Sequence, residues 1–284
     1  MNNRVTLEEI RLIEHVSALE YKSRVARGRE LLSRLYAQGI NPEIQEWHFP
    51  QTTNFIVDFS SDPNEKRLLF CAHYDAVKDC PGANDNASSV AVLLGLCQLL
   101  KNTQTPARVV FFDREESWLR TPFVRLGLLG SLYYVFSNNL KNVEAVYNLE
   151  FCGLGDSLSV WPVKDKKKDI SAVRSAKKAA AKLNLKVKLA DVPGLLLSSD
   201  HLSFRLKGIS NSITLSLLPA DQLQMLEQFV SNLSIRKILM GQRPIMPGVL
   251  SHVHKATDDS SRLNEDSLRL MLSLLVEIIK GYKF

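Results

Sequence analysis

The amino-acid sequence predicts an α/β fold, in which a mostly parallel mixed β-sheet has helices on both faces. Strand-like and helix-like stretches alternate along most of the chain, and the strand-like stretches are short apolar runs rich in β-branched and aromatic residues. Such alternation is typical of a largely parallel sheet whose functional sites form at the carboxyl ends of its strands. Polar residues follow several of these runs directly. We expect a single domain over 1–284, with insertions near 117–129 and 220–248.

The first hundred residues are predicted to form helices, then strands, then a buried helix. Thr6 can cap a helix over 7–16, and residues 27–39 carry a 3.6-residue apolar period that ends at a glycine. Strand-like runs follow at 43–49, 54–59 and 67–73. The stretch 87–101 is apolar on nearly all sides, which indicates a buried helix.

The rest of the chain continues the alternation. Its expected strands are 107–113, 143–151, 158–162, 185–189 and 211–218. One expected helix begins at Ser131, and two others span 169–183 and 263–282. The last of these is strongly amphipathic.

Composition excludes several classes of protein. The chain is 45% hydrophobic and 23% charged, as in ordinary soluble globular proteins. No apolar run approaches the roughly 20 residues that span a bilayer, and the N-terminus lacks the layout of a signal peptide. We therefore expect a cytoplasmic protein without a membrane partner.

Charge and cysteine content argue against nucleic-acid binding and against a disulfide framework. The net charge of +6 is concentrated in 164–188, which lacks the aromatic residues of a nucleic-acid surface, so we expect a solvated face and no nucleic-acid partner. Cys71, Cys97 and Cys152 lie in apolar contexts, whereas Cys80 lies in a loop. We expect the first three to be buried, Cys80 to be accessible, and no disulfide framework.

The segment 71–89 carries the strongest functional pattern. His73 ends a predicted strand, and Asp85 follows in a turn-rich loop. Further nitrogen and oxygen ligands follow other predicted strands or lie near the C-terminus: Glu115, Glu116, Glu150 and His254. Each has an ordinary structural explanation when taken alone, but their convergence at strand ends favours a metal site. Imidazole and carboxylate are ligands of Zn²⁺.

The spacing of these residues suggests separate roles. Two zinc ions about 3.5–4 Å apart need a bridging carboxylate, for which we expect Asp85. Adjacent residues seldom share one ion, so we assign Glu116 to the metal and Glu115 to proton transfer as the general base. Asp75 lies two residues after His73 and is expected to orient its imidazole or hold the loop.

With these residues assembled, the chain resembles the zinc exopeptidase family of bacterial leucyl-type aminopeptidases, which also includes glutamate carboxypeptidases and glutaminyl cyclases. The resemblance runs from about Arg24 to the C-terminus. Its motifs are AHYDAV (72–77), GANDNASSVA (82–91), FFDREE (111–116), GLLGSLYYV (127–135), SSDHLSF (198–204) and HKATDD (254–259). It implies the zinc exopeptidase fold, also called phosphorylase/hydrolase-like.

The resemblance also implies a role for each matching residue. His73 would bind one zinc, Asp85 would bridge, and Glu116 and His254 would bind the other zinc. Glu115 would be the general base. Asp200 and His201 of the SSDH motif would support the site or contact substrate. His254 is preferred over His252 because Asp258 follows it by four residues, as in the motif of the family.

Three departures from the family pattern bear on the number of metals. Glu150 occupies the position of a ligand that is usually aspartate, so the corresponding zinc site is expected to be altered. Residues 117–125 separate the glutamate pair from GLLGS, as a similar insertion does in glutaminyl cyclases, which work with one zinc. Val253 replaces the tryptophan that cyclases carry before the final histidine.

The leading hypothesis is a zinc aminopeptidase that hydrolyses N-terminal residues from peptides, with a metal-bound water as nucleophile and Glu115 as general base. Two zinc ions are expected, and one is the alternative. The substrate would be a peptide with a free N-terminus. A glutaminyl cyclase-like mono-zinc aminoacyltransferase and a non-catalytic peptidase-like binding module are the competing hypotheses. The segment 220–248 is a candidate contact in a homo-oligomer.

Overall fold

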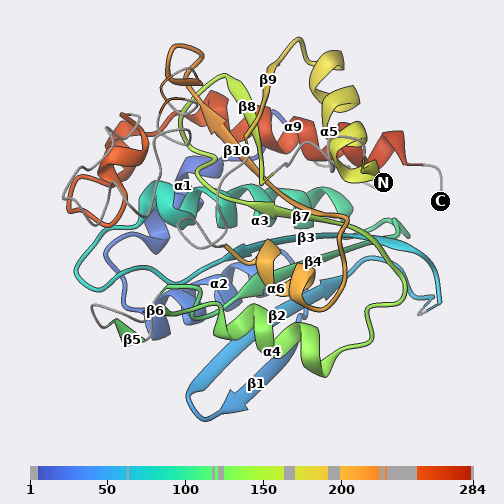
Figure 1. The fold of residues 1–284 in the computed structure, drawn as a ribbon. Helices are drawn as coiled ribbons and strands as arrows, with labels where there is room; N and C mark the ends of the chain where they lie inside the picture. Colours follow the sequence, from blue (N-terminus) through green and yellow to red (C-terminus); the bar gives the residue numbers. More distant parts are fainter. Residues whose placement is uncertain are drawn as a thin grey trace.

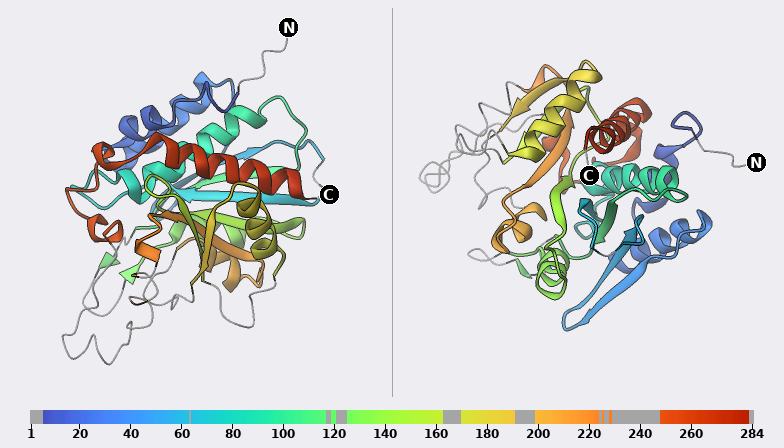
Figure 2. Two further views of the ribbon diagram at one scale, coloured as in Figure 1. Left: turned by 90° about the horizontal axis from the view of Figure 1, so that it is seen from above. Right: turned by 90° about the vertical axis from the view of Figure 1, so that its right-hand side faces the viewer.

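The computed structural model describes residues 6–62, 64–116, 119–120, 125–162, 170–190, 199–223, 225, 228 and 248–282, with the backbone alone at 119–120 and 125–126. An eight-stranded sheet crosses the molecule in the order β1-β2-β4-β3-β7-β10-β8-β9, and helices cover both of its faces (Figure 1, Figure 2). The predicted fold class is therefore confirmed.

The sheet is parallel at its centre and has antiparallel pairs on either side, and its edge strand β9 pairs parallel to β8. Its strands are β1 (Glu43–His48), β2 (Gln51–Asp58), β3 (Arg67–His73), β4 (Ala107–Phe112), β7 (Val143–Leu149), β8 (Ser157–Trp161), β9 (Lys186–Leu189) and β10 (Ser212–Leu218). β4, β3, β7 and β10 are parallel neighbours, whereas β2 and β8 pair antiparallel to β4 and β10. The carboxyl ends of the four central strands consequently meet at one edge of the sheet.

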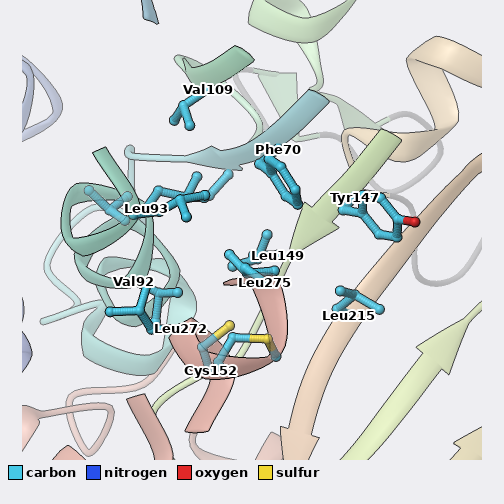
Figure 3. Packing of buried hydrophobic residues seen from close by; sticks show 14 of the residues in the cluster. Phe70, Val92, Leu93, Val109, Tyr147, Leu149, Cys152, Leu215, Leu272 and Leu275 are labelled. Atoms are coloured by element: carbon cyan, nitrogen blue, oxygen red, sulfur yellow. The ribbon is translucent and has the colours of Figure 1, made fainter. Parts of the chain in front are cut away.

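Helices on one face form the larger core. These are α1 (Leu12–Leu19), α2 (Arg24–Ala37), α3 (Ser88–Leu100), α5 (Ser171–Lys182) and α9 (Glu265–Gly281). Figure 3 shows Val92 and Leu93 of α3 and Leu272 and Leu275 of α9 in the same buried cluster as Phe70 of β3. The opposite face carries α4 (Leu129–Ser137) and α6 (His201–Leu206).

Strand β3 is buried along its whole length because both faces of the sheet are covered. Phe70 and Ala72 face the larger core, and Leu69 and Cys71 face the smaller one. A strand buried on both faces reads as a continuous apolar run rather than an alternating one. The apolar run 67–73 therefore coincides with the bounds of the strand.

The predicted start of the first helix is wrong. α1 begins at Leu12, and the amide of Thr6 instead donates to the carboxylate of Glu9 within a turn (2.7 Å). The carboxylate of Glu265, at the start of α9, accepts hydrogen bonds from the amides of Leu12 (3.1 Å) and Ile13 (2.7 Å). A residue distant in sequence thus satisfies amides that a helix start leaves free.

The other expected helices and strands are present, with bounds displaced by up to three residues. The predicted insertion at 117–129 contains the short strands β5 (Leu119–Arg120) and β6 (Arg125–Leu126), which pair with each other. The first residue of the predicted helix 169–183, and most of 220–248, lie outside the described residues.

The burial of the cysteines and the length of the helices can be compared with the sequence-based expectations. Cys71, Cys97 and Cys152 are buried, Cys80 is partly exposed, and all four are free thiols. Among the described helices, none has the length and apolar character needed to cross a membrane.

Candidate metal centre

The structure brings all five predicted metal ligands together. They follow strands or lie in turns: His73 ends β3, Asp85 lies in the helical turn η1 (Ala83–Ala87), Glu116 follows β4, Glu150 follows β7, and His254 follows the turn η3 (Leu250–His252). They form two groups, His73 with Asp85 and Glu150, and Asp85 with Glu116 and His254. Within each group the ligand atoms lie within 4.8 Å of one another.

Asp85 belongs to both groups because its two carboxylate oxygens point to different histidines. Its Oδ1 lies 3.4 Å from Nε2 of His73, and its Oδ2 lies 3.3 Å from Nε2 of His254. A carboxylate that uses one oxygen for each group has the geometry of a bridging ligand.

The three glutamates differ in their position around this bridge. Oε1 of Glu116 lies 2.9 Å from Nε2 of His254, and Oε2 of Glu150 lies 3.5 Å from Nε2 of His73. Oε2 of Glu115 lies 4.0 Å from the same His73 nitrogen and belongs to neither ligand group. Glu115 therefore stands beside the ligands, in the position expected of a proton-transfer group.

Asp75 supports three of these residues at once. Its two carboxylate oxygens accept hydrogen bonds from the amides of Glu115 and Glu116, both at 3.1 Å. Its Oδ1 also lies 3.3 Å from Nδ1 of His73. Nδ1 also lies 3.2 Å from the backbone carbonyl of Asp75, and a proton held there would leave the lone pair of Nε2 available to a metal ion.

Asp258 holds the loop that carries the bridge, a role that the sequence did not reveal. Its carboxylate accepts hydrogen bonds from the amides of Asn84 (2.9 Å) and Asp85 (3.1 Å). Burial, reinforced by the charge of Asp85, raises the pKa of Asp258 to about 6. Asn86 fixes the other side of the bridge, because its side-chain amide donates to the carbonyl of Leu149 (2.9 Å).

Glu150 is oriented by a buried polar network. The hydroxyl of Ser199 donates to its Oε1 (2.5 Å), and the amide of Asn148 donates to Ser199 (2.6 Å) and Thr214 (3.2 Å). Sequence reasoning missed Ser199 and Asn148. A signal existed for Asn148, because residues two apart on a strand share one face.

Asp200 and His201 are both buried but face different surroundings. Burial, together with the charges of Glu150 and Asp75, raises the pKa of Asp200 to about 7, although His73 and Ser131 oppose the change. By hydrogen-bond geometry its carboxylate oxygens have no partner among the described residues.

His201 belongs to neither ligand group. Its Nδ1 lies 2.8 Å from the hydroxyl of Thr214, and its ring packs edge-on against Trp161 at 5.5 Å. Burial, with a contribution from Arg205, lowers its pKa to about 3.

His252 stands outside both ligand groups. Its Nδ1 lies 2.8 Å from the hydroxyl of Thr257. This placement agrees with the preference for His254 as a ligand.

The closely packed carboxylates of the centre would be stabilised by a bound cation. Burial raises the pKa of Glu115 well above its usual value, and the carboxylates of Glu116 and Glu150 act in the same direction against His73. Burial would lower the pKa of His73, but Glu150 and Glu115 outweigh it and raise the pKa well above its usual value. Two imidazoles and several carboxylates packed this closely match the nitrogen and oxygen donors of zinc.

Comparison with known proteins identifies relatives in sequence and in fold. Aminopeptidase YwaD from Bacillus subtilis is 31% identical over 184 residues, which cover 57% of this chain and 35% of that protein. The chain thus matches about a third of the length of this curated relative. A zinc aminopeptidase from Bacillus subtilis, BSAP, has a similar fold with a TM-score of 0.58 at 23% identity, covering 82% of this chain and 52% of that one.

A second structural relative matches over nearly the full length. Glutaminyl cyclase from Porphyromonas gingivalis has a TM-score of 0.69 at 18% identity and covers 98% of this chain and 99% of its own. At these identities both structures establish the shared fold. Residues 54–279 match the family model of peptidase family M28, and they include every ligand of the candidate centre. The chain therefore belongs to peptidase family M28.

Proposed function

We propose that the chain is a di-zinc aminopeptidase that removes N-terminal residues from peptides. The observation that carries this proposal is the position of Asp85, whose two oxygens face His73 and His254 at 3.4 and 3.3 Å. Glu150 and Glu116 complete one group each. The two groups together supply the ligands for two ions that share one carboxylate.

The residues that would hold the first ion are His73, Asp85 and Glu150, and the second would be held by Asp85, Glu116 and His254. Zinc bound at these positions would supply Lewis-acid chemistry, since a bound zinc ion can polarise a carbonyl group and lower the pKa of water to about 7. The chain itself must then move one proton, from the attacking water to the leaving amine.

Glu115 is placed to move that proton. It lies beside His73 without joining either ligand group, and Asp75 fixes its backbone amide. Burial raises its affinity for a proton, which a carboxylate needs if it is to take a proton from water and return it to an amine. The carboxylate of Asp200 raises the pKa of Glu115 in the same direction.

A glutaminyl cyclase-like activity is the second candidate. Two features favour it: Glu150 stands where the family usually has aspartate, and residues 117–125 separate the glutamate pair from Gly127. In that reaction the α-amine of an N-terminal glutamine attacks its own γ-carboxamide, and Glu115 would carry the proton to the departing ammonia. Val253, in place of the expected tryptophan, weighs against this candidate.

The experiment that tests the proposal combines metal analysis with substrate hydrolysis. Purified protein is analysed by plasma mass spectrometry and incubated with a panel of aminoacyl-β-naphthylamides that includes the glutamine derivative. Two zinc ions per chain with chelator-sensitive release of naphthylamine would support the aminopeptidase. One zinc with pyroglutamyl product would favour the cyclase, and a folded chain without metal would favour the binding module.

A further inference from the structure

Arg27 is a buried cation beside the candidate metal centre. It lies in α2, and its side chain is fully buried (0% exposed). It also lies outside residues 54–279, the part of the chain that matches the M28 family model. An arginine is rarely buried unless its charge and its donors have partners.

The partners of Arg27 are the two ends of the loop between His73 and Asp85. Its Nη1 donates to the carbonyl of Tyr74 (3.3 Å), which directly follows His73. Its Nη2 donates to the carbonyl of Gly82 (3.0 Å), three residues before Asp85, and also to the carbonyl of Pro81. One planar guanidinium thus joins the point where the loop leaves the first ligand to the point where it reaches the bridging ligand.

The loop is shaped for this close approach. Gly82 has a φ of 61°, in the left-handed region that favours glycine, and a Cβ at this position would lie 2.6 Å from Nη2 of Arg27. A larger residue would therefore collide with the guanidinium and would also strain the backbone. Such a Cβ would also lie 2.7 Å from Cβ of Ala76 and 2.8 Å from the carbonyl oxygen of Asp85, so Arg27 is one of three groups that pack closely on Gly82.

The charge of Arg27 also faces the carboxylates that build the centre. Asp75, Asp85 and Asp258 all act on it electrostatically, and against the effect of burial they favour its charged form. Asp75 accepts hydrogen bonds from the amides of the glutamate pair, and Asp258 accepts one from the amide of Asp85, the bridging ligand of the proposed centre. Arg27 is therefore a fixed countercharge behind the ligands.

We propose that Arg27 is a positioning residue that sets the spacing of His73 and Asp85 before metal binds. By holding both ends of residues 74–82, it prevents the loop from drifting and keeps the bridging carboxylate opposite the imidazole. The fork of a guanidinium reaches carbonyls at both ends, which the single ammonium of lysine cannot do. This role rests on the metal centre of the proposed function.

The test compares Arg27→Lys with Arg67→Lys. Arg67 is a matched control, because it is also buried (5% exposed) and also holds a loop carbonyl, that of Asp62 (2.7 Å), but at the start of β3. Zinc affinity is measured by competition with a chromophoric chelator, and ligand geometry is read from the absorption spectrum of the cobalt-substituted protein. Melting temperature of the metal-free proteins reports structural damage separately.

We expect Arg27→Lys to weaken zinc binding by about 10–100-fold, the range seen when groups that orient metal ligands are lost, and to change the cobalt spectrum. Arg67→Lys should lower the melting temperature and leave both metal readouts unchanged. Arg27→Gln gives the same test should the lysine variant fold poorly.

Zinc affinity within threefold of wild type in the Arg27 variants would overturn this assignment alone. Absence of zinc uptake by the wild-type protein would instead overturn the proposed function, and the role of Arg27 with it.

Discussion

The hydroxyl of Ser199 donates a 2.5 Å hydrogen bond to Oε1 of Glu150 and leaves Oε2 of that carboxylate facing His73. Glutamate has one methylene more than the aspartate expected at this position, and with it one more rotatable bond. The hydrogen bond from Ser199 removes that extra freedom, so Glu150 is held in an orientation suited to a ligand. Ser199 is itself fixed by the side-chain amide of Asn148.

Substitution Ser199→Ala should therefore weaken one metal site selectively. We expect the affinity of the site formed by His73, Asp85 and Glu150 to fall by about 10–100-fold, with the other site little changed. Stepwise cobalt titration followed by absorption spectroscopy would resolve the two sites. Ser267→Ala is the control, since that buried hydroxyl donates to Gly155 of the 150–156 loop (2.8 Å). Equal loss of both sites in Ser199→Ala would contradict the assignment.

The glutamate pair should respond to substitution in opposite ways. Glu115→Gln removes the proton acceptor but no ligand, so turnover should fall by about 10²–10⁴-fold while zinc content stays near that of wild type. Glu116→Gln removes a ligand that lies 2.9 Å from His254, so zinc content itself should fall. Metal analysis and initial rates on the same preparations check both statements. Loss of zinc in Glu115→Gln alone would mean that the two roles are reversed.

The two histidines near the C-terminus offer a similar contrast. His254→Ala should remove the metal held with Glu116, because Nε2 of His254 faces both that carboxylate and Asp85. His252→Ala should leave the metal content unchanged, since its ring contacts Thr257. Plasma mass spectrometry of both variants after dialysis measures the zinc content that distinguishes the two histidines. Unchanged zinc in His254→Ala would move the ligand assignment to His252.

Much of the fold could be predicted because the local pattern and the tertiary environment agree. Strand β3 is apolar throughout since both faces of the sheet are covered, and the pattern of α9 matches its amphipathic packing. The start of α1 could not be predicted, because Glu265, far along the chain, supplies the acceptor for its first amides. The antiparallel pairing of β8 with β10 likewise depends on contacts distant in sequence.

The metal ligands could be predicted for a related reason. His73 and Glu150 follow parallel strands that are neighbours in the sheet, so a strand prediction already places them at one edge. The supporting residues gave weaker signals. Arg27 reaches the centre from an N-terminal helix, and Asp258 belongs to the HKATDD motif, but the motif does not specify that its carboxylate holds backbone amides.

The buried imidazole of His201 predicts how stability depends on pH. Burial lowers its pKa to about 3, whereas an unfolded chain holds a histidine near its usual value of about 6.5. The unfolded chain therefore binds the proton more readily, so the stabilisation is fully present above pH 6.5 or so and is lost as the pH falls toward about 3. The loss approaches about 1.4 kcal/mol per pH unit within that window.

Urea unfolding of chelator-treated protein between neutral pH and about pH 4.5 would measure this dependence. His201→Gln should lower the free energy of unfolding at neutral pH, because the contacts with Thr214 and Trp161 change, but its stability should fall less steeply with acidification. His48→Gln is the control, since it also removes an imidazole but from an exposed position on β1. Parallel curves for wild type and His201→Gln would show that folding leaves the pKa of His201 unchanged, contrary to the lowering by burial.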